Sequence, residues 1–516
     1  MSTASNPILP GCHPDPSICR VGDEFFLVTS TFEYLPGLPI HRSADLVEWE
    51  LIGHAIDRPG MLDLDGMASS SGLYAPTLRH HDGRFWLVCT LVDQADPSRG
   101  GNFLITAEDP AGPWSEPAWI DADGIDPSLF FDDDGRAWVH GTRPARSPQW
   151  PGQTEIWLRE LDVSARALIG PEHVLWRGAV IGAVWAEGPH LYRIGGRYYL
   201  VAAEGGTEMH HAVSVARADA VTGPYTGAPS NPVLSHRQLG RTADIVATGH
   251  ADLVQAPDGG WWAVLLAMRP YGGLHANLGR ETFLAPVVWE DGWPVFAPGE
   301  GRVRTEVEVP FARGARAEAP IAVLPEDRRW TSVRARPEDV AVADGAGWSL
   351  PLRPEGPEDA RPFAFLGIRQ QDVDVEVVLR LSGRLAFGEE CGLLVRQSER
   401  DQARLAVRPE PGGGAMRVTV TLVRAGETID RGSLTLETGL DEGVELTLSA
   451  RGQDYALLAG DGRGEPSLVA TIDGRSLDPF SAGGFLGVWI GAYATSWGAE
   501  TDSVVRLDSV EYRALS

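Results

Sequence analysis

The chain has 516 residues, which is more than one ordinary hydrophobic core accommodates, so we expect two or more domains. Its formal net charge of −27 argues against binding to nucleic acid or to an anionic membrane surface, because both would repel it. An apolar fraction of 43%, with 17 tryptophans, excludes a disordered chain and indicates a globular protein rich in aromatic residues.

The four cysteines (Cys12, Cys19, Cys89 and Cys391) are too few for a disulfide framework and show no C-x-x-C spacing. The first residues, MSTASNPILP, contain no basic segment followed by an apolar run, and no apolar stretch of about 18 residues, as a membrane span needs, occurs. We therefore expect a cytoplasmic protein without a membrane partner. The sequence leaves open whether the protein forms a homo-oligomer.

Five segments in the N-terminal part of the chain share one pattern, in which a turn with Pro or Asp precedes a polar loop and an aromatic strand. They are HPDPSICRVGDEFFLV, YAPTLRHHDGRFWLV, IDPSLFFDDDGRAWV, AEGPHLYRIGGRYYLV and GHADLVQAPDGGWWAV. Aligned on Ile18, Leu78, Leu129, Leu191 and Leu253, they recur roughly every 50 to 60 residues. Such a period indicates a repeat architecture.

Each unit is typical of a hairpin followed by a second pair of strands, because apolar runs such as FFLVTS and YYLVAAE are rich in aromatic and β-branched residues. About four strands per unit and five units predict a five-bladed β-propeller over residues 1–305. The tip of the third hairpin, FFDDDG, places Asp132, Asp133 and Asp134 in a turn where we expect them to be solvated.

The rest of the chain has a different pattern. Residues 306–325, rich in Ala, Pro and Arg, are predicted to be a linker. Residues 326–516 contain alternating segments such as DVDVEVVLRLSG and MRVTVTLVRAG, which predict an antiparallel β-sandwich of the jelly-roll type. The whole chain is therefore expected to be all-β. The sandwich could bind sugar, shape a pocket of the propeller or form a subunit interface.

Carboxylates stand at the starts of three of the repeated units. Unit one has Asp15, unit three has Asp126 and unit four has Glu187, whereas units two and five have Ala75 and His250 near the equivalent place. Because the innermost strands of a propeller surround one axis, these starts meet at one mouth. Three carboxylates around a pocket raise each other's proton affinity, which acid–base catalysis near neutral pH uses. A single Asp before Pro commonly caps a turn, but three in register favour a catalytic cluster.

The motifs together resemble a known family. They include NPILPGCHPDPS, TSTFEYLPGLPIHRSADLVEWELIGHAI, YAPTL, GIDPSLFFDDDG, WAEGPHLY, AEGGTEMHHAVSVARA, GHADLV and GRETFLAPV, and they span nearly the whole chain. The sequence is similar to glycoside hydrolase family 43, and within it to the β-xylosidases with a C-terminal sandwich domain.

The resemblance implies a role for each carboxylate. Asp15 would be the general base that takes a proton from the attacking water, and Glu187 the general acid that protonates the leaving oxygen. Asp126 would tune the pKa of Glu187 and orient it. An inverting site of this kind leaves room for water, so acid and base should lie roughly 6.5–9.5 Å apart.

The resemblance also implies substrate-binding residues. Phe32 would wall the terminal-sugar subsite, and Tyr74 stands where these enzymes commonly have Trp, which alters the expected shape of that subsite. Arg280 would reach the sugar hydroxyls; a structural ion pair with a nearby acid such as Glu281 is the alternative for it. His250 would support the site from the central channel, either through a bound calcium ion or as a hydrogen-bonded histidine without metal. No other cofactor is expected, and one imidazole is a poor calcium site by itself.

The expected function is an inverting exo-glycosidase that releases xylose from the non-reducing ends of β-1,4-xylo-oligosaccharides. An α-L-arabinofuranosidase, or an enzyme with both activities, is the first alternative, because the two sugars present similar hydroxyl groups to a small pocket. A non-catalytic glycan- or protein-binding propeller is a second. A retaining enzyme acting on fructosides is a third, but the chain lacks the R-D-P triplet of that group.

Overall fold

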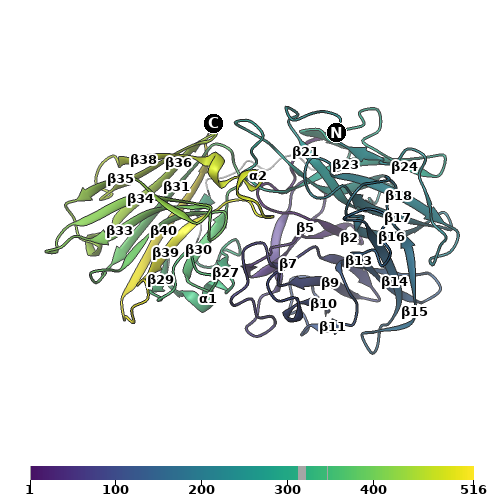
Figure 1. The fold of residues 1–516 in the computed structure, drawn as a ribbon, viewed down its shortest axis with the longest axis horizontal. Coiled ribbons are helices and arrows are strands. Elements are labelled where there is room, and N and C mark those ends of the chain that lie inside the picture. Colours follow the sequence, from purple (N-terminus) through teal and green to yellow (C-terminus); the bar gives the residue numbers. More distant parts are fainter. Residues whose placement is uncertain (1, 312–320, 323, 346, 516) are drawn as a thin grey trace.

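The computed structural model describes residues 2–311, 321–322, 324–345 and 347–515, which form two β-rich parts side by side (Figure 1). The N-terminal part consists of five antiparallel sheets arranged as blades. The strands of blades one and two are β2 (Ser17–Val21), β3 (Glu24–Val28), β5 (Gly37–Ser43) and β6 (Glu50–Ile56), then β8 (Thr77–His81), β9 (Arg84–Val92), β10 (Gly101–Ala107) and β11 (Ala118–Ile120), with β7 (Gly72–Leu73) paired to β9.

Blades three to five continue in chain order. Their strands are β12 (Ile125–Phe131), β13 (Ala137–Pro144), β14 (Thr154–Asp162) and β15 (Ala167–Trp176); β16 (Glu187–Ile194), β17 (Arg197–Glu204), β18 (Ala212–Ala218), β19 (Thr226–Gly227) and β20 (Leu234–Ser235); and β21 (Val246–Gln255), β22 (Trp261–Met268), β23 (Glu281–Glu290) and β24 (Trp293–Phe296). A short 3-10 helix, η1 (Pro97–Arg99), precedes β10.

The innermost strands close into a ring. β2 contacts β8, β8 contacts β12, β12 contacts β16, β16 contacts β21, and β21 returns to β2. The residues on which the repeats align (Ile18, Leu78, Leu129, Leu191 and Leu253) lie one on each of these strands, and all are buried. The predicted five-bladed propeller is confirmed.

Paired aromatic residues in the second strand of a blade pack on opposite sides of it. Phe25 joins Ile18 and Trp262 in the core between blades one and five, whereas Phe26 meets Phe85 in the core between blades one and two. Successive side chains of a strand point to opposite faces. Because every blade is covered on both faces, its central strands are apolar throughout, which explains the FF, FW, YY and WW pairs of the repeat.

The ends of the propeller are joined by backbone pairing. β1 (Ser2–Ser5) pairs with β25 (Glu306–Val309). Asn6 exchanges two side-chain hydrogen bonds with the backbone of Leu284 in blade five, at 2.8 and 2.9 Å. The first residues of the chain are thereby attached to the last blade.

A polar cluster on the axis ties the blades together below the strand starts. Asp252 of blade five accepts hydrogen bonds from Arg79 of blade two at 2.8 Å, from Ser17 of blade one at 2.7 Å and from the Tyr192 hydroxyl of blade four. Burial alone would raise the pKa of Asp252, but the charges of Arg79 and His190 and the hydrogen bonds from Arg79 and Tyr192 together lower that pKa well below its usual range. A buried carboxylate is stable when it is paired in this way.

Asp132 corrects one expectation from the sequence. Its side chain is buried and accepts a hydrogen bond from the Tyr198 hydroxyl at 2.7 Å, whereas Asp133 and Asp134 are exposed. Asp132 therefore anchors the third hairpin tip to blade four, and only its two neighbours are solvated turn residues.

The C-terminal part is a sandwich of two antiparallel sheets. The strands of the larger sheet, in spatial order, are β28 (Val342–Asp344), β29 (Gly347–Pro351), β40 (Val504–Ala514), β31 (Val375–Gly383), β36 (Val444–Arg451), β37 (Asp454–Gly460) and β38 (Ser467–Asp473), with β26 (Ile321–Ala322) also on β40. Those of the other sheet are β30 (Ala364–Arg369), β39 (Trp489–Thr495), β32 (Glu390–Arg396), β33 (Gln402–Pro409), β34 (Met416–Arg424) and β35 (Glu427–Leu436).

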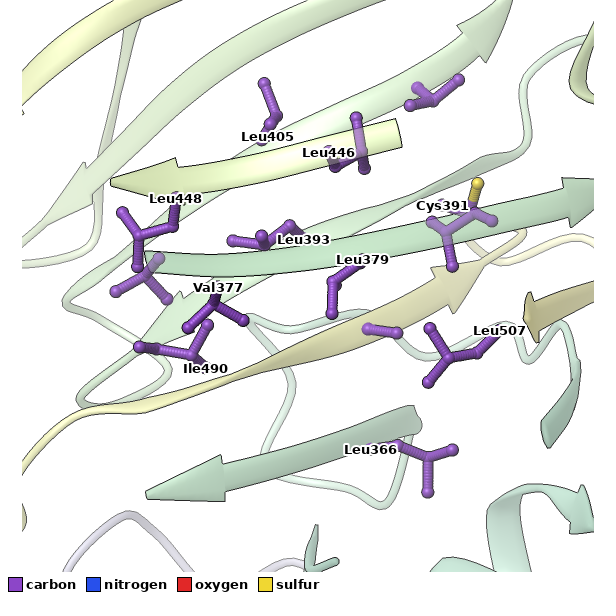
Figure 2. Packing of buried hydrophobic residues seen from close by; sticks show 14 of the residues in the cluster. Leu366, Val377, Leu379, Cys391, Leu393, Leu405, Leu446, Leu448, Ile490 and Leu507 are labelled. Atoms are coloured by element: carbon purple, nitrogen blue, oxygen red, sulfur yellow. The ribbon is translucent and has the colours of Figure 1, made fainter. Parts of the chain in front are cut away.

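Side chains from both sheets fill the space between them (Figure 2). Along β31 the buried residues Val375, Val377, Leu379 and Leu381 alternate with partly exposed ones, as expected of a strand with one face in the core. Short helical turns connect the strands: α1 (Pro337–Val340), α2 (Pro479–Ala482), η2 (Leu440–Glu442) and η3 (Gly474–Leu477). The predicted β-sandwich is confirmed.

A small sheet crosses from one part to the other, in which β4 (Tyr34–Leu35) of the propeller pairs with β27 (Ser332–Val333). The division at 305 and 326 stays a prediction, since residues 312–320 and 323 of the predicted linker 306–325 lie outside the described residues. All four cysteines are free and buried. Within the described ranges, none of the helices has the length and apolar character that crossing a membrane requires.

Candidate active site

Irregular backbone marks the starts of three inner strands. β12, β16 and β21 each show register shifts against the next strand, at residues 125–128, 187–190 and 249–252. Such bulges re-aim side chains and are common beside active sites. Asp15, Asp126 and His250 also adopt positive φ angles of 54°, 52° and 51°, which are uncommon for residues other than glycine.

The register of unit four differs by one residue from what the sequence suggested. Gly188, with φ of 53°, occupies the position equivalent to Asp15, Asp126 and His250, so Glu187 stands one residue earlier. A Cβ atom at position 188 would lie only 2.8 Å from the His250 ring. Glycine at this position therefore makes room for the imidazole, and the carboxylate comes from the residue before it.

Asp15 is buried and held by three groups. It accepts hydrogen bonds from Ser30 Oγ at 2.6 Å and from Arg280 Nη1 at 3.1 Å, and its Oδ1 lies 3.8 Å from His250 Nδ1. Burial by itself would raise the pKa of Asp15, but the charges of Arg280 and His250 and the Ser30 hydrogen bond together lower it. Asp15 is therefore ionised at neutral pH.

The other two carboxylates are shifted in the opposite direction. Burial, followed by the charges of Asp126 and Asp15, raises the pKa of Glu187 well above its ordinary value. Burial also dominates at Asp126, and it raises the pKa of that carboxyl to about 6 although His250 and a hydrogen bond from Gly188 N, at 3.0 Å, favour the charged form. The cluster thus combines an ionised carboxylate with a protonated one, the pairing that acid–base catalysis needs.

Aromatic rings line one side of Arg280. Its guanidinium lies 5.4 Å from the ring of Phe32 and 5.3 Å from that of Phe485, and these two rings stack at 5.7 Å. Tyr74 packs edge-on against both. Arg280 forms an ion pair with Asp15 at 3.1 Å, whereas Glu281 pairs with Arg269 at 2.7 Å.

Phe485 is the residue that sequence reasoning missed. It belongs to the sandwich domain, in the segment between α2 and β39, yet it lies against Phe32, Tyr74 and Arg280. The only local signal is a Phe-Leu pair between glycines, GGFLG, and nothing in the linear pattern relates that segment to Arg280. The sandwich therefore contributes directly to the wall of the site.

A buried polar chain connects this wall to the sandwich. Arg396 on β32 pairs with Glu33 at 3.3 Å, and Glu33 accepts a hydrogen bond from Ser70 N at 3.0 Å. Ser70 in turn accepts hydrogen bonds at its Oγ from Phe485 N, at 2.9 Å, and at its carbonyl oxygen from the Tyr74 hydroxyl, at 3.0 Å. Two aromatic residues of the wall thus depend on one serine that the interdomain ion pair holds.

The described side chains near His250 supply few of the ligands that calcium takes. That ion takes 6–8 oxygen ligands, whereas His250 offers one nitrogen and Asp15 is already engaged by Ser30 and Arg280. The described residues contain no group of three or more His, Cys, Asp or Glu side chains arranged to hold a metal ion. We therefore derive no catalytic step through a metal.

Comparisons with known proteins cover the whole chain. A family model described as glycosyl hydrolases family 43 matches residues 4–294, and a model of the beta xylosidase C-terminal concanavalin A-like domain matches residues 324–513. The chain is 41% identical over 520 residues to a xylosidase/arabinosidase of Butyrivibrio fibrisolvens, covering 98% of each chain.

Solved structures agree along the full length. The structure of Bacteroides ovatus xyloglucan PUL GH43B superimposes with a TM-score of 0.90 at 35% identity, covering 100% of both chains. The xylan beta-1,4-xylosidase of Bacillus halodurans superimposes with a TM-score of 0.91 at 31% identity, covering 99% of this chain and 100% of the other.

Proposed function

The chain belongs to glycosyl hydrolases family 43 and is a glycosidase, and from this premise we propose that it releases terminal xylose from β-1,4-xylo-oligosaccharides with inversion. The observation that carries the proposal is the opposite tuning of two carboxyl groups in one buried cluster, with the pKa of Asp15 lowered and that of Glu187 raised. Two carboxyls with these charge states are what a glycosidase uses, and inversion is what the resemblance to the family implies.

In the proposed reaction Asp15 accepts a proton from a water molecule as the water oxygen bonds to the anomeric carbon. Glu187 gives its proton to the glycosidic oxygen as the bond between that oxygen and the anomeric carbon breaks. Asp126 does not exchange protons with substrate; its negative charge keeps the pKa of Glu187 high. His250 and Arg280 favour the charged form of Asp15, and Arg280 with Phe32, Tyr74 and Phe485 would hold the terminal sugar.

An α-L-arabinofuranosidase is the second candidate, and the relatives favour keeping it. One relative, 35% identical over 99% of this chain and 95% of its own length, is a non-reducing end alpha-L-arabinofuranosidase of Bacteroides ovatus, and another is named for both sugars. Tyr74, whose hydroxyl is tied to Ser70 and Gln94, gives the sugar subsite a shape different from one with Trp.

The decisive experiment measures hydrolysis of nitrophenyl β-D-xylopyranoside and nitrophenyl α-L-arabinofuranoside by the wild type and by Glu187→Gln. We expect xyloside hydrolysis by the wild type. In the variant, hydrolysis of xylobiose should fall about 10²- to 10⁴-fold, because its sugar leaving group needs the general acid, and hydrolysis of the nitrophenyl xyloside should fall less. Proton NMR of the first product should show α-xylose. A fully active variant would refute the role of Glu187, initial β-xylose would refute inversion, and a faster arabinoside reaction would favour the second candidate.

We also propose that the substrate is a short oligosaccharide encountered in the cytoplasm. The support is that all four cysteines are free and buried, which is usual in a protein of a reducing compartment. Cell fractionation followed by activity assay tests this placement, and activity confined to the medium would contradict it.

A further inference from the structure

A groove of about 510 Å³ lies on blades three and four, between the loop that joins β13 to β14 and the segment that precedes β16. Two tryptophans and three prolines dominate its lining, which carries no ionisable side chain. The lining residues are Pro144, Ala145, Pro148, Gln149, Trp150, Pro151, Gly152, Gln153, Thr154 and Trp185.

The groove is on the same face of the propeller as the carboxylates. In an antiparallel four-stranded blade, the loop between the second and third strands and the connection into the next blade lie at the end where the first strand starts. Trp185 precedes Glu187 by one residue, Ala186, whose carbonyl oxygen accepts a hydrogen bond from Thr154 of the groove at 2.8 Å. The groove is therefore continuous with the backbone that carries the proposed acid.

Hydrogen bonds fix the Trp150 side chain and the Trp185 backbone in the groove. Trp150 Nε1 donates to the carbonyl oxygen of Ala183 at 2.8 Å, and Trp185 N donates to that of Gly152 at 3.0 Å. Behind them the buried carboxylate of Glu204 accepts hydrogen bonds from the backbone N–H groups of residues 179 and 180. A preorganised surface loses little conformational entropy when a ligand binds.

The surface stays open to solvent despite its apolar character. Trp185 is 40% exposed, and Ile181 in the same segment is 91% exposed. Contiguous exposed apolar residues rimmed by polar groups mark ligand-binding grooves. In a chain with a net charge of −27, an uncharged aromatic groove suits a neutral ligand that offers apolar faces for stacking and hydroxyl groups for the Gln149 amide.

We propose that this groove binds the leaving-group sugars of the substrate, that is, the remainder of a neutral β-linked oligosaccharide beyond the bond that is cleaved. The inference rests on the proposed function, because Glu187 protonates the first oxygen of that leaving group. The groove, next to Glu187, then makes catalytic efficiency depend on chain length.

The kinetic test compares xylohexaose with nitrophenyl β-D-xylopyranoside in wild type, Trp185→Ala and Trp119→Ala. Trp119 is a matched control, since it is 52% exposed on β11, away from the groove. We expect Trp185→Ala to lower kcat/KM for xylohexaose roughly three- to tenfold more than for the aryl xyloside, the range one aromatic contact supplies. Equal effects on both substrates, or the same differential loss in Trp119→Ala, would overturn the proposal.

A binding test needs no turnover and so separates this proposal from the proposed function. Calorimetric titration of Glu187→Gln should show tighter binding of xylohexaose than of xylobiose, and the difference should vanish when Trp185→Ala is added. Equal affinities for the two sugars in Glu187→Gln would overturn the groove. Failure of the wild type to hydrolyse any xyloside would instead overturn the proposed function, whatever the titrations show.

Discussion

Glu33 and Arg396 form an ion pair across the domain boundary, with 3.3 Å between Oε1 and Nη1 and neither side chain exposed. Glu33 directly follows Phe32 and holds Ser70, and Ser70 holds the Phe485 backbone and the Tyr74 hydroxyl. The pair therefore links the fold of the sandwich to the geometry of the aromatic wall. A buried pair of this kind is costly to break because the remaining charge stays desolvated.

Arg396→Met should accordingly destabilise the protein by about 3–5 kcal/mol, since it leaves the Glu33 carboxylate buried without its partner. At temperatures where the variant is folded, KM for the aryl glycoside should rise more than kcat falls, because the wall that holds the sugar is displaced while the carboxylates are not. Urea unfolding and steady-state kinetics measure both effects.

Arg42→Met is the control for that variant. Arg42 pairs with Glu50 at 2.8 Å, but the side chains are 44% and 66% exposed. Such a surface pair contributes at most about 1 kcal/mol. Equal losses of stability in the two variants, or an unchanged KM in Arg396→Met, would show that the interdomain pair does not position the wall.

Asp126→Asn should shift the basic limb of the pH–activity profile to lower pH. After burial, the charge of Asp126 is the next largest cause of the raised pKa of Glu187, so its removal lowers that pKa. The acid must be protonated, so activity is lost as pH rises through the pKa of Glu187. The limb should move by the order of one pH unit in kcat/KM.

The acidic limb is the internal reference for this measurement. This limb reports the ionisation of Asp15, whose pKa is governed by burial, Arg280 and His250 rather than by Asp126. A basic limb that stays in place, or one that moves to higher pH, would contradict the role proposed for Asp126.

The same substitution should change the pH dependence of stability. Burial raises the pKa of Asp126 in the folded protein from an ordinary 3.8 to about 6, so the folded state binds a proton that the unfolded chain has already released. Stability from this group is complete below pH 4 and is lost as pH rises through 6. Asn keeps an acceptor for Gly188 N without the charge, so Asp126→Asn should gain about 3 kcal/mol at pH 8 and little at pH 4. Urea midpoints at both pH values measure this, and a variant less stable than wild type at pH 8 would refute it.

The propeller was predictable because each blade is packed on both faces. Its central strands therefore contain paired aromatic residues, such as Phe25 and Phe26, that recur at a regular interval in the sequence. The carboxylates were candidates for the same reason, since the repeat gives them equivalent or adjacent positions; their roles stay predictions. Contacts such as Phe485 with Arg280 leave no periodic trace, because they depend on how two domains dock. The one-residue offset of Glu187 can be read from the alignment, since Glu187 stands four residues before Leu191. Its cause cannot, because that is the space that His250 requires beside Gly188.

Gly188→Ala tests that requirement directly. The residue has φ of 53°, and a Cβ there would lie 2.8 Å from His250 Nδ1 and Cε1, so the imidazole must move away from Asp15. Gly195 in the β16–β17 turn has φ of 59° and nothing within 4 Å of its would-be Cβ. Because of this left-handed backbone conformation, Ala at either position should lower the free energy of unfolding by a similar amount, about 1–2 kcal/mol. We expect comparable losses of stability in the two variants. Only Gly188→Ala should also lose kcat and show an acidic limb of the pH–activity profile at higher pH, because Asp15 loses the His250 charge that lowers its pKa. If Gly195→Ala lowers kcat as much, or if Gly188→Ala keeps both kcat and the position of the acidic limb, then Gly188 does not position His250 beside Asp15.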